Sequence, residues 1–101
     1  MRLLLAALLF AAQAGATEVA IDQKKMKFQP DKVAIHPGDT LVFQNSDPVN
    51  HNIQVVSDDD TIDVGLQHPG QTVKQSFAKA GSFEVRCTVH PEMLLSVTVK
   101  P

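Results

Sequence analysis

The sequence predicts an all-β sandwich, and three observations support this fold class. Apolar and polar residues alternate in several short runs, turn-forming residues separate these runs, and helical spacing is hard to find. Short strands that recur about every 8–12 residues are typical of β-sandwiches and barrels. We expect about seven to eight strands joined by Greek-key connections.

The predicted strands follow one another through the chain after an apolar N-terminal segment. Each is an alternating or β-rich run, at residues 19–21, 33–35, 40–44, 53–55, 73–77, 83–87 and 97–99. Gly, Pro, Asn and Asp punctuate the intervals, as at residues 37–39, 47–48, 58–60, 68–70 and 80–81. Only residues 58–67 are expected to form a long connection.

Alternation implies that each sheet has one apolar face, and two such faces pack together to form the core. The core candidates are the large apolar residues of the alternating runs: Phe28, Val33, Ile35, Leu41, Phe43, Phe77, Phe83, Val85, Val97 and Val99.

Residues 1–16 have the pattern of a secretory signal peptide. Arg2 is followed by the apolar run 3–14, and Ala14-Gly15-Ala16 supplies the small residues of a cleavage site after Ala16. A retained N-terminal anchor is the alternative, although the run is short for a span of about 20 residues. We therefore expect export to the periplasm, no stable membrane insertion after cleavage, and one domain at residues 17–101.

Composition excludes several function classes. The chain of 101 residues has 9 basic and 11 acidic residues and no basic stripe, which argues against nucleic-acid binding. No Gly-rich phosphate loop or nucleophile elbow is present. The sequence therefore predicts no catalytic residues, and we do not expect an enzyme.

The single cysteine, Cys87, needs an explanation in an exported chain. It cannot form a disulfide within the chain, so it forms an intermolecular bond, is a buried inert thiol, or binds a metal. Taken alone, a buried thiol is the common case.

The residues around Cys87 favour the metal. Cys87, His90 and Met93 stand at i, i+3 and i+6 between two predicted strands, where a tight loop can turn all three toward one point. His51, at the start of another strand, is the fourth candidate, because a sandwich brings distant loops together at one end. Two imidazoles, a thiolate and a weak thioether suit copper in an electron-transfer site, whereas structural zinc usually takes several cysteines.

The remaining polar candidates are expected to have no role in metal binding. His36 and His68 each precede a Pro-Gly pair and are predicted to be surface loop residues, with a second, weaker copper site or a partner contact as the alternative. The acidic residues 58–60 and Asp63 lack the spacing of an EF-hand and are predicted to form a solvated turn.

The chain resembles the cupredoxins, the small type 1 blue copper proteins, and among them the amicyanin and plastocyanin-like branch. The resemblance rests on motifs across nearly the whole mature region, at residues 25–28, 33–35, 38–43, 45–51, 81–83 and 87–93. It implies that His51, Cys87 and His90 are equatorial ligands of one copper ion, with Met93 axial. It also implies that the Asn45 amide bonds near the Cys87 sulfur or to the neighbouring backbone, which ties the two ligand loops together. Electrons would pass through a partly exposed His90.

The chain departs from its relatives at a few positions beside these ligands. Asn50 stands where many relatives have proline before the first histidine, and Val89 where proline often precedes the second. Leu95 stands where amicyanin has a glycine. These changes bear on the reduction potential and the docking surface and remove no ligand.

The leading hypothesis is a monomeric one-electron shuttle that meets its partners transiently at the His90 end. The expected apolar patch comprises Val89, Met93, Leu94 and Leu95, and the resemblance suggests a dehydrogenase donor and a c-type cytochrome acceptor. Two alternatives stay open: a copper-delivery protein with the same ligands, and a metal-free immunoglobulin-like binding module.

Overall fold

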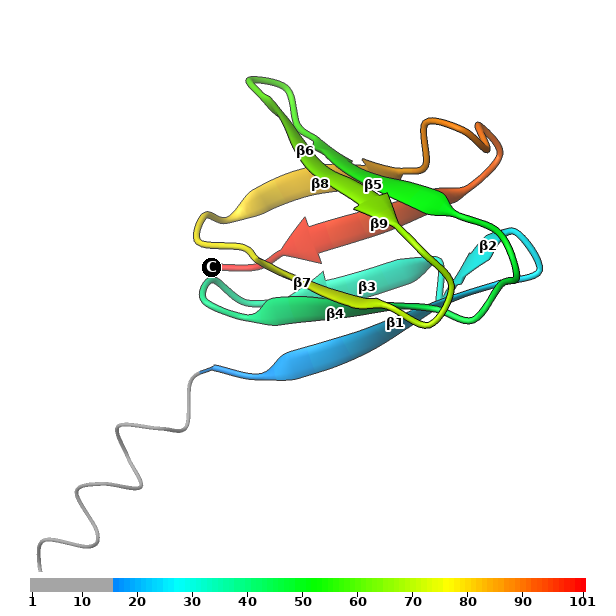
Figure 1. Ribbon diagram of the computed structural model, residues 1–101. Helices are drawn as coiled ribbons and strands as arrows, with labels where there is room; N and C mark the ends of the chain where they lie inside the picture. The colour runs from blue at the N-terminus through cyan, green and yellow to red at the C-terminus, as the bar shows by residue number, and fades with distance from the viewer. Residues whose placement is uncertain (1–15) are drawn as a thin grey trace, which may run out of the picture.

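The structure, a computed structural model, describes residues 16–101, which form two packed β-sheets (Figure 1). The described residues contain nine strands: β1 (Glu18–Lys24), β2 (Lys27–Gln29), β3 (Lys32–Ile35), β4 (Thr40–Asn45), β5 (His51–Val56), β6 (Thr61–Gln67), β7 (Thr72–Ser76), β8 (Gly81–Arg86) and β9 (Leu94–Val99). The predicted all-β sandwich is confirmed, with nine strands in place of seven to eight.

The strand order shows how distant segments meet. One sheet has the order β2-β1-β4-β7 and the other β3-β9-β8-β5-β6. The pairs β1–β4 and β3–β9 are parallel, and the other pairs are antiparallel. Because β5 and β8 are neighbours, the start of β5 and the end of β8 lie at the same end of the sandwich.

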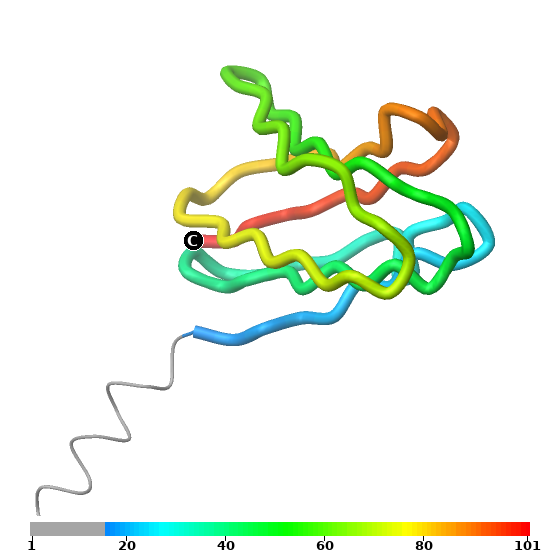
Figure 2. The backbone as a smooth tube through the Cα atoms, in the orientation of Figure 1, coloured from blue at the N-terminus to red at the C-terminus, as the bar shows by residue number. Residues whose placement is uncertain are grey.

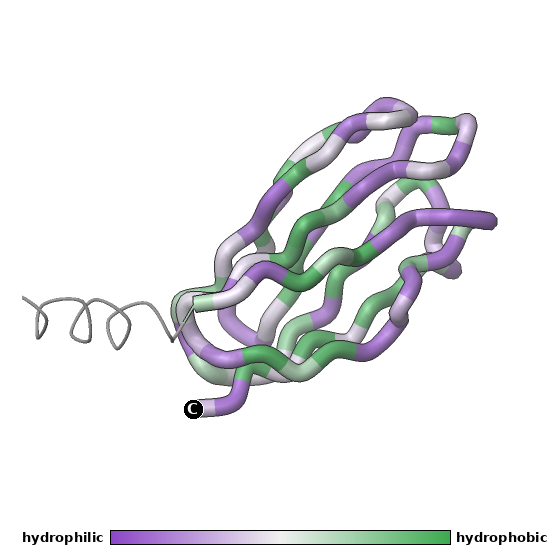
Figure 3. Tube along the Cα trace, turned by 90° about the horizontal axis from the view of Figure 1, so that it is seen from below, coloured by the Kyte–Doolittle hydropathy of each residue, from purple (hydrophilic) through white to green (hydrophobic). Residues whose placement is uncertain are grey.

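The core lies between the two sheets and follows the predicted alternation. In β9 every second residue is buried, and the hydropathy of the chain alternates along most strands (Figure 3). Eight of the ten predicted core residues are buried, and Val33 and Phe83 are partly buried against them. The structure adds Ile21, Ile53, Val55, Cys87, Met93 and Leu95 to the core.

Two strands were absent from the sequence prediction. The expected long connection at residues 58–67 is wrong, because Thr61–Gln67 forms β6. This strand lies at the edge of its sheet, is mostly exposed, and is interrupted by a register shift opposite Ile53 and Gln54. Ile62, Val64 and Leu66 do alternate with polar residues or glycine, so the period of two was present in the sequence and was overlooked. In the structure Ile62 and Leu66 stay exposed. The three-residue β2 is too short to show any period.

The predicted signal peptide, residues 1–16, lies outside the described residues except for Ala16. From Ala16 onward, no helix is both long and apolar enough to cross a membrane.

Candidate metal centre

Two loops at one end of the sandwich carry the predicted ligands. His51 begins β5, and the segment 87–93 connects β8 to β9 at the same end (Figure 2). Within this segment the N–H of His90 donates to the Cys87 carbonyl (3.3 Å), and the N–H of Met93 donates to the His90 carbonyl (2.9 Å). These two successive turns replace extended geometry, which would place the side chains of Cys87 and His90 on opposite faces.

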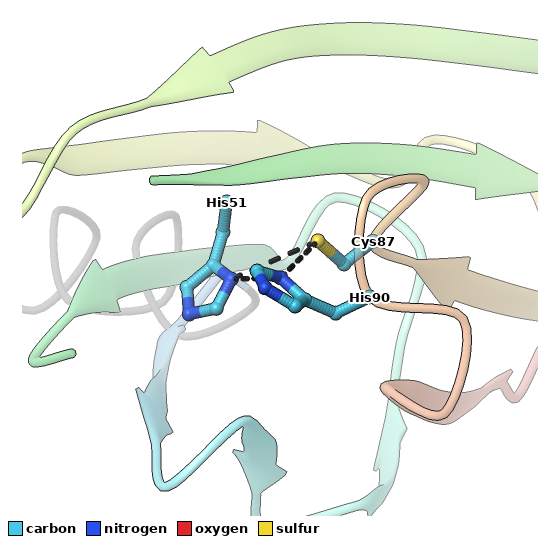
Figure 4. Close-up of side chains that lie close together, drawn as sticks. All are labelled: His51, Cys87 and His90. Atoms are coloured by element: carbon cyan, nitrogen blue, oxygen red, sulfur yellow. Dashed lines mark hydrogen bonds between the residues drawn. The ribbon is translucent and has the colours of Figure 1, made fainter. Parts of the chain in front are cut away.

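Three donor atoms converge between the loops. The Nδ1 atoms of His51 and His90 are 3.1 Å apart, and the Cys87 Sγ lies 3.7 Å from the first and 3.6 Å from the second. Figure 4 shows the three side chains pointing toward one another. Donors that bind one ion at about 2.0–2.3 Å must lie roughly 3–4 Å apart. The three atoms therefore fit a single metal ion, and His51, Cys87 and His90 form the only such cluster among residues 16–101.

The three side chains differ in their access to solvent. His51 and Cys87 are fully buried, whereas His90 is partly exposed. Met93 is also buried, with 1% of its surface exposed, and it ends the same loop. The cluster therefore meets the exterior through His90, as the resemblance implied.

A backbone hydrogen bond fixes the sulfur. The N–H of Asn52 points at the Cys87 Sγ at 3.4 Å, and the Asn52 side-chain oxygen accepts a hydrogen bond from the Thr88 hydroxyl at 2.9 Å. Donors aimed at a ligand sulfur orient it and tune its electron density. Asn52 and Thr88 thus join β5 to the Cys87 loop.

This arrangement corrects the expectation for Asn45. Its amide donates to the carbonyls of Val49 (2.9 Å) and Gln67 (3.2 Å), and its oxygen accepts the N–H of Asp47 (3.0 Å). Asn45 therefore shapes its own loop and joins it to the end of β6. The partners of Asn45 are set by which backbone groups lie within its reach, and the residue type alone does not reveal them. The residue that connects the two candidate ligand loops is therefore Asn52.

Asp47 is the main functional candidate that sequence reasoning missed. Its buried carboxylate lies 2.8 Å from the His51 Nε2 and accepts the backbone N–H groups of Lys25 (2.7 Å) and Met26 (3.0 Å). An ionised carboxylate only accepts hydrogen bonds, so Nε2 carries the hydrogen of His51 and Nδ1 keeps its lone pair. Asp47 thereby directs the Nδ1 lone pair toward Cys87 and His90.

The carboxylate of Asp47 is kept ionised by its surroundings. Burial alone raises its pKa, but the hydrogen bond from His51 and the backbone N–H groups of Met26 and Lys25 outweigh burial and lower the pKa below its usual value. Lys25 and Met26 have positive φ angles of 55° and 60°, so the same carboxylate also holds a turn in a sparsely populated conformation.

The expected apolar patch is partly wrong. Val89 and Leu94 are exposed, but Met93 and Leu95 are buried, because alternate residues of β9 face the core. Two apolar residues that were not predicted, Val49 before His51 and Leu66 beside Asn52, are also exposed at this end. We call His90, Val49, Leu66, Val89 and Leu94 together the His90 face.

The other polar candidates are not part of the donor cluster, although His68 lies at the same end of the sandwich, directly after Gln67, which pairs with His51. His36 and His68 are exposed, as predicted, and the His68 Nδ1 lies 3.0 Å from the Asn50 side-chain oxygen. The acidic residues 58–60 are exposed in the turn between β5 and β6.

Known proteins share both this sequence pattern and this fold. The sequence profile of the copper-binding proteins of the plastocyanin/azurin family matches residues 15–100. The chain is 33% identical over 92 residues to amicyanin-alpha of Methylorubrum extorquens, covering 88% of this chain and 76% of that protein. It is 26% identical over 93 residues to amicyanin of Paracoccus denitrificans, covering 89% and 71%.

The solved structures agree with the sequence comparison. A mutant of amicyanin in its reduced state superposes with a TM-score of 0.75 at 27% identity, covering 89% of each chain. The matched family and the three converging donors together identify one copper ion as the cofactor. The chain therefore belongs to the plastocyanin/azurin family of copper-binding proteins, the cupredoxins, and resembles the amicyanins among them.

Proposed function

We propose that this protein is a periplasmic one-electron carrier, and not an enzyme, whose copper ion is held by His51, Cys87, His90 and Met93. The convergence of two imidazoles and a thiol within 4.8 Å carries the proposal. Bound copper supplies a one-electron couple between Cu(II) and Cu(I), for which this donor set is suited. Met93 would be the fourth residue to hold the copper, a role supported by its position in the Cys87 loop, its burial and the family resemblance.

The protein supplies a rigid and shielded frame for this couple. His51 is anchored by Asp47, and Cys87 follows β8 and receives the Asn52 N–H. Side chains held by packing and hydrogen bonds move little when the charge of a site changes, which suits electron transfer. The full burial of His51 and Cys87 hinders ligand exchange, so it favours an electron carrier over a copper-delivery protein.

The His90 face suits brief contacts with redox partners. It combines the one partly exposed imidazole of the donor cluster with four exposed apolar side chains at the same end of the sandwich. Redox encounters use small interfaces, below about 1,200 Å². We propose a dehydrogenase as donor and a c-type cytochrome as acceptor, by analogy with the amicyanins, and a monomeric protein that meets them in turn.

An optical titration tests the proposed function. One equivalent of Cu(II) added to the mature protein is expected to produce an intense blue band that ascorbate removes, because a thiolate bound to Cu(II) absorbs visible light strongly. A colourless Cu(II) complex contradicts the proposal. Rapid surrender of the copper to a chelator by a blue protein instead supports the delivery role.

A charge on the His90 face is expected to slow electron exchange. Val89→Asp places a carboxylate on a side chain that is 56% exposed beside His90. When two copies meet through this face, the like charges repel, and a cost of about 1.4 kcal/mol lowers the rate about tenfold. The electron self-exchange rate between the Cu(I) and Cu(II) forms, measured by NMR line broadening, reports this directly.

The matched control for this prediction is Ile62→Asp. Ile62 is 44% exposed on β6 but lies near the β5–β6 turn, away from the donor cluster. Ile62→Asp adds the same charge away from the His90 face. The self-exchange rate of this variant should therefore stay near that of the unmodified protein. Equal slowing by both substitutions would indicate a net-charge effect and argue against docking through the His90 face.

A further inference from the structure

The carboxylate of Asp39 lies at the opposite end of the sandwich from the donor cluster and is almost completely buried. Only 3% of the residue is exposed. Its Oδ2 accepts the N–H of His36 at 2.9 Å, and its Oδ1 accepts the N–H of Thr17, also at 2.9 Å. Residues 16–101 form three ion pairs, and none of them includes Asp39. The carboxylate is thus held by two backbone N–H groups and is in no ion pair, and the His36 side chain is the ionisable group that acts on it electrostatically.

Backbone hydrogen bonds fix the positions of both Thr17 and Asp39. The carbonyl of Thr17 accepts the N–H of Thr40 at 3.0 Å, which extends the parallel pairing of β1 with β4 by one residue. Asp39 closes a turn onto His36 (3.0 Å), and its carbonyl accepts the N–H of Phe77 (3.0 Å). The nitrogen of Thr17 therefore meets the carboxylate through the register of the sheet.

The sequence predicts that Thr17 is the first residue of the exported protein. We propose that cleavage after Ala16 creates the missing cation: the new α-ammonium group of Thr17 forms an ion pair with the Asp39 carboxylate and locks β1 onto the sandwich. The inference depends on the predicted cleavage and is independent of copper binding. Hydrolysis of the Ala16–Thr17 peptide bond consumes one water molecule and leaves a carboxylate on Ala16 and an amine on Thr17.

The geometry is specific for this one peptide bond. Cleavage one residue earlier would leave an uncharged amide at Thr17 and move the ammonium group about 3.8 Å along the chain. Cleavage one residue later would remove Thr17 together with its bond to Thr40. An α-amino group has an ordinary pKa of about 7.7–8.0, so it is charged at neutral pH, and a charge-assisted hydrogen bond is about twice as strong as a neutral one.

The surroundings of Asp39 favour its ionised form. The backbone N–H groups of His36 and then of Thr17 lower the pKa of Asp39 against the opposing effect of burial, and the Thr17 side chain and the His36 imidazole lower it further by smaller amounts. The carboxylate is therefore charged when the ammonium group forms beside it.

The test uses the full chain, exported with its own leader and purified after processing. N-terminal sequencing is expected to begin at Thr17, and NMR titration is expected to give its α-amino group a pKa above the ordinary value. Carbamylation with cyanate, which neutralises the α-amine, should then lower Tm by about 4–8 °C, the shift for a net loss near that of one hydrogen bond in a domain of this size.

Two substitutions sharpen the result. In Asp39→Asn the α-amino pKa should return to its ordinary value, and carbamylation should no longer change Tm. Asp58→Asn, at an exposed acidic residue, removes the same charge and should leave both effects intact. Should Asp39→Asn fail to fold, the pKa and the carbamylation shift of the unmodified protein still decide the question.

Two results would overturn the proposal at different points. A first residue other than Thr17 shows that processing does not deliver the cation to Asp39. An ordinary α-amino pKa, or an unchanged Tm on carbamylation, in a protein that does begin at Thr17 shows that no ion pair forms. Neither result bears on the blue band, so a failure here is distinguishable from a failure of the proposed copper function.

Discussion

Replacing Cys87 by serine is expected to abolish the intense blue absorption of the Cu(II) protein. The colour depends on charge transfer from a thiolate, and Cys87 is the only cysteine in the chain. Serine is nearly the same size and keeps an acceptor for the Asn52 N–H, so the fold should tolerate it. His51 and His90 should still bind Cu(II), more weakly and with little colour. Optical titration of the variant beside the unmodified protein measures both effects.

The control for this prediction is Thr88→Val. It removes the hydroxyl that bonds to Asn52 at 2.9 Å and leaves the Cys87 sulfur in place. The variant should remain blue with a modest shift in its band, because Asn52 is held less firmly. An intense visible band that survives Cys87→Ser would mean that another group generates it, and the proposed ligand set would be wrong.

The fold class could be predicted from the sequence alone, and the three converging donors could be predicted with the help of the family resemblance. Alternation along β4, β8 and β9 predicts two facing sheets directly, since one face of each strand must leave water. The candidate ligands Cys87, His90 and Met93 were recognisable because they lie within one short loop, where sequence spacing limits spatial distance. His51 was harder, and only the family resemblance and the general behaviour of sandwich loops placed it there.

The rest depended on contacts between distant residues. Asp47 meets the backbone of Lys25 and Met26, and nothing in the sequence near His51 reveals that the β1–β2 turn lies beside it. Asn45 was expected to bond near Cys87, yet the residue that does so is Asn52. Its backbone N–H points at the sulfur, a contact that depends on the backbone and is not visible in the sequence. The error in the apolar patch has a different origin.

That error concerns where β9 begins. If the strand starts at Leu94, the period of two buries Leu95 and exposes Leu94. The predicted burial of Val97 and Val99 fixes which side of β9 faces the core, and the period of two extends this to Leu95 only if the strand reaches back that far. Strand ends are poorly defined by sequence, so the composition of the His90 face required the structure.

Asp47→Asn is expected to weaken copper binding without removing the blue colour. An amide in place of the carboxylate no longer offers two anionic oxygens to the His51 Nε2–H and to the N–H groups of Lys25 and Met26. Substituting the group that orients a metal-binding histidine typically lowers metal affinity 10–100-fold, and we expect a loss in that range (~10–100-fold). Competition with a chelator of known affinity measures it.

Removing the Asp47 carboxylate should also lower the free energy of unfolding of the copper-free protein. Asp47→Ala leaves two backbone N–H groups of a strained turn without their acceptor, and hydrogen bonds to charged groups contribute about 1.5–3 kcal/mol each. Urea unfolding of the copper-free protein should therefore show a loss of at least about 2 kcal/mol.

Asp22→Asn is the control that separates the role of Asp47 from a general loss of charge. Asp22 accepts the Ser46 hydroxyl at 2.6 Å beside the same loop, but it does not contact His51. Its copper affinity should match that of the unmodified protein. If Asp47→Asn also keeps full affinity, then the imidazole of His51 is oriented by packing alone. The hydrogen bond at 2.8 Å would then serve the β1–β2 turn, and the metal centre would be positioned by the sandwich rather than by its acidic neighbour.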